Sequence, residues 1–292
     1  MNLEIFDERI CLLGEGPTSS GQANNAIMWV DIIGKKILTR DFFSGITTEE
    51  LFHEEVGFAL PGQDSSVVIG FASGIKYISP NRPELSLPNW TKISPEKPGT
   101  PVRWNDAKIS PHNQLYGGTM AFDATPEAGG LYRISSDGQQ IDELISKVSI
   151  SNGLDWSPDS NKFYYIDTLK YSVAQYDYDE SGISNPSTLI SFPHGDVLPD
   201  GMCVDAEGGL WIAFWNGGCV KRFESNGNLS ETIELPVKNV TSCSFGGANL
   251  ETLIITTAAL TNEDNPKAGM TFMVQPGVIG KASNLYSSPL TL

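Results

Sequence analysis

The stretch Leu210-Trp-Ile-Ala213 is one of several short apolar runs that decide the fold of this chain. Each run is rich in β-branched or aromatic residues, a composition that favours β-strands. The six runs are Met28-Trp-Val-Asp31, Val67-Val-Ile-Gly70, Leu115-Tyr-Gly-Gly118, Phe163-Tyr-Tyr-Ile166, Leu210-Trp-Ile-Ala213 and Leu253-Ile-Ile-Thr256. Consecutive runs begin 39 to 48 residues apart, so a unit of about 45 residues repeats along the chain.

A second apolar run with a similar pattern follows several of the first ones, and glycine-containing turns separate them. These second runs are Lys36-Ile-Leu-Thr-Arg-Asp41, Gly130-Leu-Tyr-Arg-Ile134, Ser172-Val-Ala-Gln-Tyr-Asp177 and Cys219-Val-Lys-Arg-Phe223. A period of about 40–50 residues with several short strands per unit is typical of a β-propeller. Six such units nearly fill the 292 residues, which predicts a single all-β domain over residues 1–292, a six-bladed β-propeller. A pair of β-sandwiches is the alternative, and it fits the even spacing less well.

The ring of blades must also close, because an open end would leave sheet edges unpaired. We expect an N-terminal strand within residues 4–13 to join the C-terminal blade near Thr271–Val274.

The charge balance excludes several partners. Nineteen basic and 35 acidic residues give a net charge of −16 and a pI near 4.5, so the surface repels phosphate backbones. We therefore expect neither nucleic acid nor a membrane as a partner. No basic leader and no apolar run of about 18 residues is visible, and the four cysteines are scattered, which favours a cytoplasmic protein. A monomer or weak dimer is the default expectation.

Candidate chemistry lies in acids and amides beside glycine or proline. The motifs are Gly14-Glu-Gly-Pro17, Arg103-Trp-Asn-Asp106, Ser151-Asn-Gly-Leu-Asp155 and Leu198-Pro-Asp-Gly-Met202. In a propeller, loops from different blades converge on one end of the central axis, where oxygen atoms from three blades would suit a hard divalent cation. Asn-Gly and Pro-Asp-Gly are each also ordinary turn sequences, and only their joint occurrence in different repeats favours the ligand interpretation.

These motifs, in this order, resemble the regucalcin (senescence marker protein)/gluconolactonase family of six-bladed propellers. The resemblance spans nearly the whole chain, and it also includes Gly117-Gly-Thr-Met-Ala121, Phe163-Tyr-Tyr-Ile-Asp167 and Thr241-Ser-Cys-Ser-Phe-Gly-Gly247.

The resemblance implies one divalent cation held by Glu15, Asn152 and Asp200. The donor set leaves Ca²⁺, Mg²⁺, Mn²⁺, Zn²⁺ and Fe²⁺ open. It also implies that Arg103 and Asn105 bind substrate, with an acidic residue after Met120. The nearest match for that acid is Asp123, which is one methylene shorter than the glutamate that family members often carry there.

The implied reaction is hydrolysis of a sugar-acid lactone, a gluconolactone-like aldonolactone, to the aldonic acid. The cation would polarise the lactone carbonyl and activate water. Asp200 is our candidate general base, with Asp106 or Asp123 as alternatives that need not also be ligands. Two other functions stay open: hydrolysis of an aryl ester or phosphotriester at the same site, and a non-catalytic calcium-binding propeller.

Overall fold

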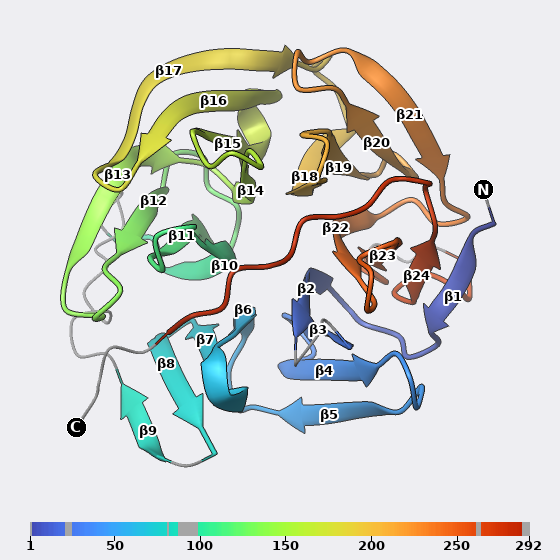
Figure 1. Ribbon diagram of the computed structural model, residues 1–292, viewed down its shortest axis with the longest axis horizontal. Coiled ribbons are helices and arrows are strands. Elements are labelled where there is room, and N and C mark those ends of the chain that lie inside the picture. The colour runs from blue at the N-terminus through green and yellow to red at the C-terminus, as the bar shows by residue number, and fades with distance from the viewer. Residues whose placement is uncertain (1, 21–24, 81, 87–98, 261–263, 288–292) are drawn as a thin grey trace.

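The protein is an all-β structure of six four-stranded antiparallel sheets arranged around a central axis (Figure 1). The computed structural model describes residues 2–20, 25–80, 82–86, 99–260 and 264–287. This arrangement confirms the predicted six-bladed propeller, and each apolar run of the repeat forms the second strand of a blade.

Five blades use four strands that are consecutive in the chain. The first contains β2 (Gly14–Ser20), β3 (Ala26–Asp31), β4 (Lys36–Asp41) and β5 (Thr47–Leu51). The second contains β6 (Val56–Pro61), β7 (Val67–Phe71), β8 (Gly74–Ser79) and β9 (Arg82–Ser86). The third contains β10 (Val102–Ile109), β11 (Leu115–Ala121), β12 (Gly129–Ile134) and β13 (Ile141–Val148). The fourth contains β14 (Ser151–Trp156), β15 (Lys162–Asp167), β16 (Ser172–Asp179) and β17 (Gly182–Ser191). The fifth contains β18 (Leu198–Val204), β19 (Leu210–Trp215), β20 (Cys219–Phe223) and β21 (Leu229–Glu234).

The sixth blade closes the ring with strands from both ends of the chain. It contains β22 (Val240–Gly246), β23 (Thr252–Thr257), β24 (Thr271–Val274) and β1 (Glu4–Asp7). β1 pairs antiparallel with β24, and Ile5 lies opposite Phe272. The predicted closure by an N-terminal strand is therefore confirmed, although that strand is shorter than the expected range.

The core lies between neighbouring blades, where apolar side chains of one sheet pack on the next. Between the third and fourth blades, Tyr116 packs edge-on against Trp156, with ring centroids 5.1 Å apart. Trp156 is fully buried, as are Trp29 and Trp211 in other blades. Burial of one large apolar side chain stabilises a fold by about 1.5–3 kcal/mol, so the stacking of blades is the main source of stability.

The first strands of the blades, β2, β6, β10, β14, β18 and β22, pack against one another around the axis. Their beginnings meet at one end of the axis, where the Asn105 side chain contacts Asn152. Their far ends meet at the other, where Lys108 contacts Asp155 and Met202. We call these the entry end and the strap end.

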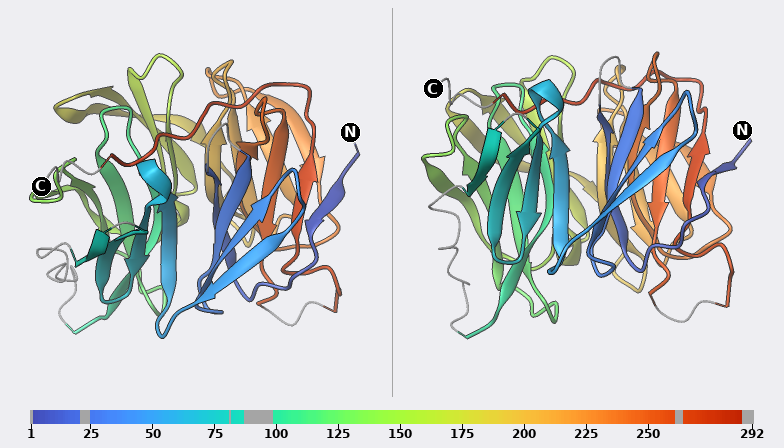
Figure 2. Two further views of the ribbon diagram at one scale, coloured as in Figure 1. Left: turned by 60° about the horizontal axis from the view of Figure 1, so that its bottom comes forward. Right: turned by 90° about the horizontal axis from the view of Figure 1, so that it is seen from below.

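The strap is the segment of residues 275–286, which leaves β24 and crosses one face of the propeller (Figures 1 and 2). It is anchored by isolated bridges from Gly280 to Asp205 and from Tyr286 to Gly62. Two short 3-10 helices, η2 (Gln63–Ser65) and η3 (Thr168–Lys170), lie in connections. No helix in the described parts of the chain is long and apolar enough to cross a bilayer.

Candidate functional site at the entry end

Each of the six inner strands breaks its register with the next strand close to the entry end. The breaks fall between Glu15 and Thr18, Val56 and Phe58, Trp104 and Ala107, Ser151 and Leu154, Pro199 and Met202, and Val240 and Ser242. Such bulges bend a strand and re-aim its side chains. Apart from Asp123, the candidate site residues therefore lie inside bulged strands, not in the loops that their motifs predicted.

Two glycines of these motifs, Gly153 and Gly201, lie within strands and not in turns. Each of them allows neighbouring inner strands to pack closely. A Cβ atom on Gly153 would lie 2.7 Å from the backbone nitrogen of Met202, and one on Gly201 would lie 2.2 Å from Ser242 Oγ. Real Cβ atoms are not found at such distances, so only glycine lets β14, β18 and β22 approach this closely.

The structure brings the three candidate metal ligands to the entry end, and all three are buried. Glu15, Asn152 and Asp200 are only 8%, 5% and 6% exposed. Burial, and next the negative charge of Glu15, raises the pKa of Asp200 well above its usual range. Burial, and next the charge of Asp106, likewise raises the pKa of Glu15. The two carboxylates are therefore held close together, out of water, in mutual repulsion.

The Asn152 amide has a fixed orientation. Its Nδ2 donates to Thr168 Oγ1 at 2.7 Å, and the Thr168 hydroxyl donates to the Pro199 carbonyl at 2.9 Å. This chain of bonds ties η3 to the strand that carries Asp200. It leaves Asn152 Oδ1 facing the site, where it accepts one hydrogen bond from Asn105.

Arg103 and Asn105 form one network with the ligand set. Arg103 Nη1 donates to Asn105 Oδ1 at 2.6 Å and to the Trp104 carbonyl at 3.0 Å. Asn105 Nδ2 donates to Asn152 Oδ1 at 2.8 Å and to the Ser151 carbonyl at 2.7 Å. The Asn105 amide is thus fully engaged, and it links the arginine to the candidate ligand Asn152.

Asp123 and Asp106 differ sharply in environment. Asp123 is exposed, in the turn beyond β11, and its Oδ1 accepts hydrogen bonds from the backbone nitrogen and hydroxyl of Thr125. Asp106 is 9% exposed and lines a narrow hollow together with Glu15, Gly16, Ile32, Gly57 and Asn105. Burial raises the pKa of Asp106 to about 6, although the Lys108 ammonium acts to lower it.

The donors fit a divalent cation on two observations. Asp200 Oδ1 is buried, and among the described residues it has no hydrogen-bond partner. Two buried carboxylates with raised pKa values lower their energy if a cation neutralises them. No group of three or more His, Cys, Asp or Glu side chains able to hold a metal is found in the described residues. The candidate set has two carboxylates, and its third member is an amide, a donor set that hard divalent cations accept.

Two aspartates that are not among the predicted site residues fix the chain just before the ligands. Asp31, at the end of β3, accepts backbone hydrogen bonds from Leu12 and Leu13 at 3.0 Å. Asp167, at the end of β15, accepts them from Ser149 and Ile150 at 3.2 and 3.1 Å. The two blades use the same arrangement, because Glu15 comes two residues after Leu13 and Asn152 comes two residues after Ile150. The recurrence of aspartate at the end of a second strand is the sequence signal that could have found them.

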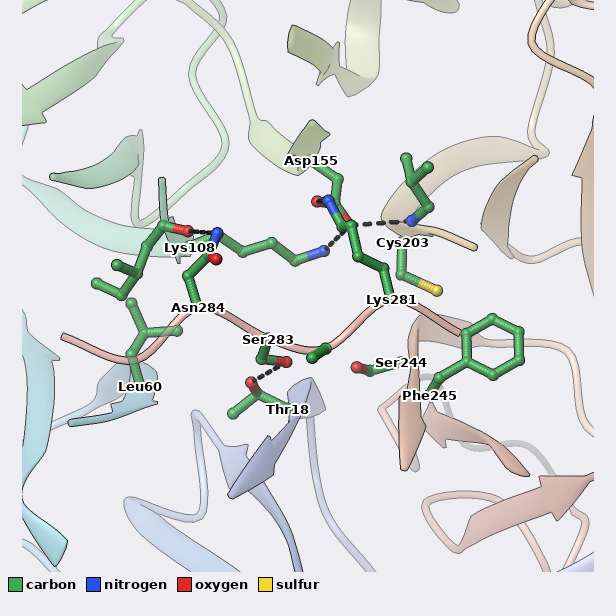
Figure 3. Close-up of a pocket in the computed structure, with 13 residues that line it drawn as sticks. Thr18, Leu60, Lys108, Asp155, Cys203, Ser244, Phe245, Lys281, Ser283 and Asn284 are labelled. Carbon is green, nitrogen blue, oxygen red and sulfur yellow. Dashed lines mark hydrogen bonds and ion pairs between the residues drawn. The ribbon is translucent and has the colours of Figure 1, made fainter. Parts of the chain in front are cut away.

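The strap end carries a different set of charges (Figure 3). Lys108 Nζ and Lys281 Nζ approach the two oxygens of Asp155 at 3.0 and 2.7 Å, and Lys281 Nζ also donates to the Trp156 carbonyl at 2.7 Å. Burial acts to raise the pKa of Asp155, but the two ammonium groups lower it below its usual range. The Asp155 carboxylate is thus neutralised by two lysines, whereas at the entry end Arg103 is ion-paired with Glu55, and the pKa values of Glu15 and Asp200 stay raised.

Comparisons with known proteins cover almost the whole chain. Residues 13–259 match the sequence model of a protein family described as the SMP-30/gluconolactonase/LRE-like region. Regucalcin of Danio rerio is 36% identical over 277 residues, 90% of this chain and 90% of that protein. A putative sugar lactone lactonase of Bacillus subtilis is 34% identical over 272 residues, 90% of this chain and 91% of that protein. The crystal structure of a calcium-binding protein, regucalcin, from Agrobacterium tumefaciens has a TM-score of 0.89 at 26% identity and covers 98% of this chain and 97% of that one.

Proposed function

Because the chain belongs to the SMP-30/gluconolactonase/LRE-like family, we propose that it hydrolyses a gluconolactone-like sugar lactone to the aldonic acid. The family supports either a sugar lactone hydrolase or a calcium-binding propeller. In our proposal residues 1–292 act as one domain, and Glu15, Asn152 and Asp200 hold one divalent cation. When bound, such a cation supplies a Lewis acid for the lactone carbonyl and lowers the pKa of water.

Arg103 binds and orients the lactone. Its Nη1 is engaged with protein acceptors, whereas Nη2 has no hydrogen-bond partner among the described residues. A guanidinium at this position donates to the ring oxygen and hydroxyls of a polyhydroxylated lactone and stabilises negative charge that develops during attack. Asn105 acts mainly by holding Arg103 and Asn152 in place, since its own amide groups are engaged.

A carboxylate must take the proton from the attacking water. We assign this role to Asp200, whose Oδ1 is buried and has no hydrogen-bond partner among the described residues. Asp106 is the alternative base, because it need not be a ligand and its pKa of about 6 is close to the ideal for proton transfer near neutral pH. We also propose that the exposed Asp123, whose carboxylate accepts a hydrogen bond from Thr125, contacts the substrate.

One observation carries the proposal: two buried, mutually repelling carboxylates lie beside a buried arginine with a donor to spare. A site that only stored calcium would gain nothing from Arg103, whose positive charge opposes cation binding. An aryl esterase would need an uncharged surface to pack against the aryl group, and a guanidinium does not provide one. The calcium-binding propeller and the esterase are both outcomes that the test below can show.

The test is turnover of a panel of aldonolactones, followed with a pH indicator after chelation and after adding back Ca²⁺, Mg²⁺, Mn²⁺ or Zn²⁺. Spontaneous hydrolysis is subtracted. We expect cation-dependent turnover that Asp200→Ala abolishes. If Asp106 is the base instead, Asp106→Asn should also abolish turnover. Cation binding without turnover on any lactone would refute the lactonase and leave the esterase and the calcium-binding propeller as the remaining functions. Arg103→Lys should impair sugar lactones far more than a neutral aryl ester; equal loss on both would favour the esterase.

A further inference from the structure

Glu55 reaches the site from the second blade, which contributes none of the candidate functional motifs of the sequence analysis. It directly precedes β6, and the close approach of β6 to β10 brings it to the entry end. That approach depends on Gly57, because a Cβ atom there would lie 2.2 Å from the Trp104 carbonyl oxygen. In this position, Glu55 Oε2 lies 3.5 Å from Arg103 Nε.

Glu55 is the acidic residue that acts most strongly on Arg103. Burial lowers the pKa of Arg103, and the carboxylates that oppose this effect are Glu55 first, then Glu15 and Asp200. Asp123 is not among them, because its carboxylate is turned to Thr125 on the exposed surface. The Glu55 side chain is 25% exposed and that of Arg103 is 9% exposed, so Glu55 lies on the solvent side of the pair, where a substrate arrives.

We propose that Glu55 is a substrate-binding residue whose carboxylate accepts a hydrogen bond from a lactone hydroxyl while Arg103 donates beside it. This inference rests on the proposed lactonase function and names the feature of the substrate that the site selects. Among the described residues, Arg103 is the one partner of the Glu55 carboxylate, so its second oxygen is available to a ligand.

The pair presents an acceptor and a donor side by side, which matches a ring carrying a hydroxyl next to its carbonyl or ring oxygen. A lactone without hydroxyls would cover the second oxygen of the Glu55 carboxylate without offering it a donor. Sites built to bond a substrate hydroxyl discriminate strongly against analogues that lack it. Glu55 is therefore a specificity determinant for hydroxylated lactones.

The experiment compares Glu55→Gln with wild type on glucono-δ-lactone and on δ-valerolactone, which lacks the hydroxyls. A hydrogen bond to a charged group contributes about 1.5–3 kcal/mol, so kcat/KM for gluconolactone should fall about 10- to 100-fold, mainly through KM. The value for δ-valerolactone should change less than about threefold. Glu54→Gln is the matched control, because the neighbouring Glu54 carboxylate bonds Ser73 at 2.6 and 2.9 Å, away from Arg103. The Glu54→Gln variant should have the same kcat/KM as wild type for both lactones.

A binding measurement tests the contact between Glu55 and a ligand hydroxyl without turnover. Anhydroglucitol, a neutral hydroxylated ring, should bind the cation-loaded Glu55→Gln variant about tenfold more weakly in calorimetry. Equal losses on the two lactones would overturn the inference and reduce Glu55 to a positioning residue for Arg103, and unchanged kinetics and binding would overturn it altogether. These results require an active wild type; a wild type inactive on every lactone refutes the proposed function itself and the inference with it.

Discussion

Replacement of Asp200 by asparagine should stabilise the cation-free protein, although a buried residue is being changed. Asp200 is 6% exposed, its Oδ1 has no hydrogen-bond partner among the described residues, and its carboxylate is repelled by Glu15. Its pKa is raised in the folded state, so at neutral pH its ionisation costs folding free energy. The Asp200→Asn amide has nearly the same shape and no charge, and it removes that cost.

The magnitude follows from the cost of the buried charge. A buried acceptor without a partner costs about 1–3 kcal/mol, and more when it is charged. We therefore expect a gain of about 2 kcal/mol, which for a domain of this size corresponds to a rise of about 4 °C in Tm. A cation at one hundred times its Kd stabilises wild type by about 2.7 kcal/mol, and the variant should lose most of that gain. The order of the two Tm values should thus reverse when the cation is added.

The assay is differential scanning calorimetry at pH 7.5 in a chelator and in a cation series. Asp155→Asn is the matched control, because Asp155 is also a buried inner-strand aspartate but is paired with Lys108 and Lys281. It should lower Tm with and without the cation. If Asp200→Asn lowers Tm in chelator, then the buried Asp200 charge does not destabilise the cation-free protein. If the cation raises the Tm of the variant as much as that of wild type, then Asp200 is not a ligand. Either result would refute the reasoning.

Three further predictions concern the groups that support the site. Thr168→Val removes the bond that orients Asn152, and should weaken cation binding about 10- to 100-fold by calorimetric titration while leaving the fold intact by circular dichroism. Gly201→Ala forces a Cβ atom onto the next inner strand, and should lower the free energy of unfolding by about 1–3 kcal/mol in urea. Lys281→Met should cost about 1–2 kcal/mol at pH 7, less than a fully buried pair because Lys281 is 23% exposed. The pKa of Asp155 is lowered in the folded state, so this loss should be full above pH ~4 and shrink as pH falls further; a loss that does not change with pH would contradict the pairing.

The blades could be predicted because each repeat carries its own apolar pattern. The runs at residues 28–31, 163–166 and 210–213 are second strands, and the N-terminal strand does close the sixth blade. The bulges could not be predicted, because Asn-Gly and Pro-Asp-Gly occur in turns as readily as in strands. Only the packing of β14 against β18 shows that Gly153 permits close approach.

The site could be predicted as a set of residue types but not as a network. The motifs named Arg103 and Asn105, yet sequence spacing does not show that the Asn105 amide is consumed by Arg103 and Asn152. Glu55 escaped notice because no glycine or proline is directly adjacent to it and because it approaches from another blade. Tertiary proximity of this kind has no local signal in the chain.

The central claim, one divalent cation held by Glu15, Asn152 and Asp200, is tested most directly by a crystal structure of the Mn²⁺-loaded protein with anomalous data. The account predicts a single anomalous peak at the entry end, within about 2.0–2.6 Å of an oxygen from each of the three side chains. A peak elsewhere on the acidic surface, or a cation that contacts neither Glu15 nor Asp200, would contradict it.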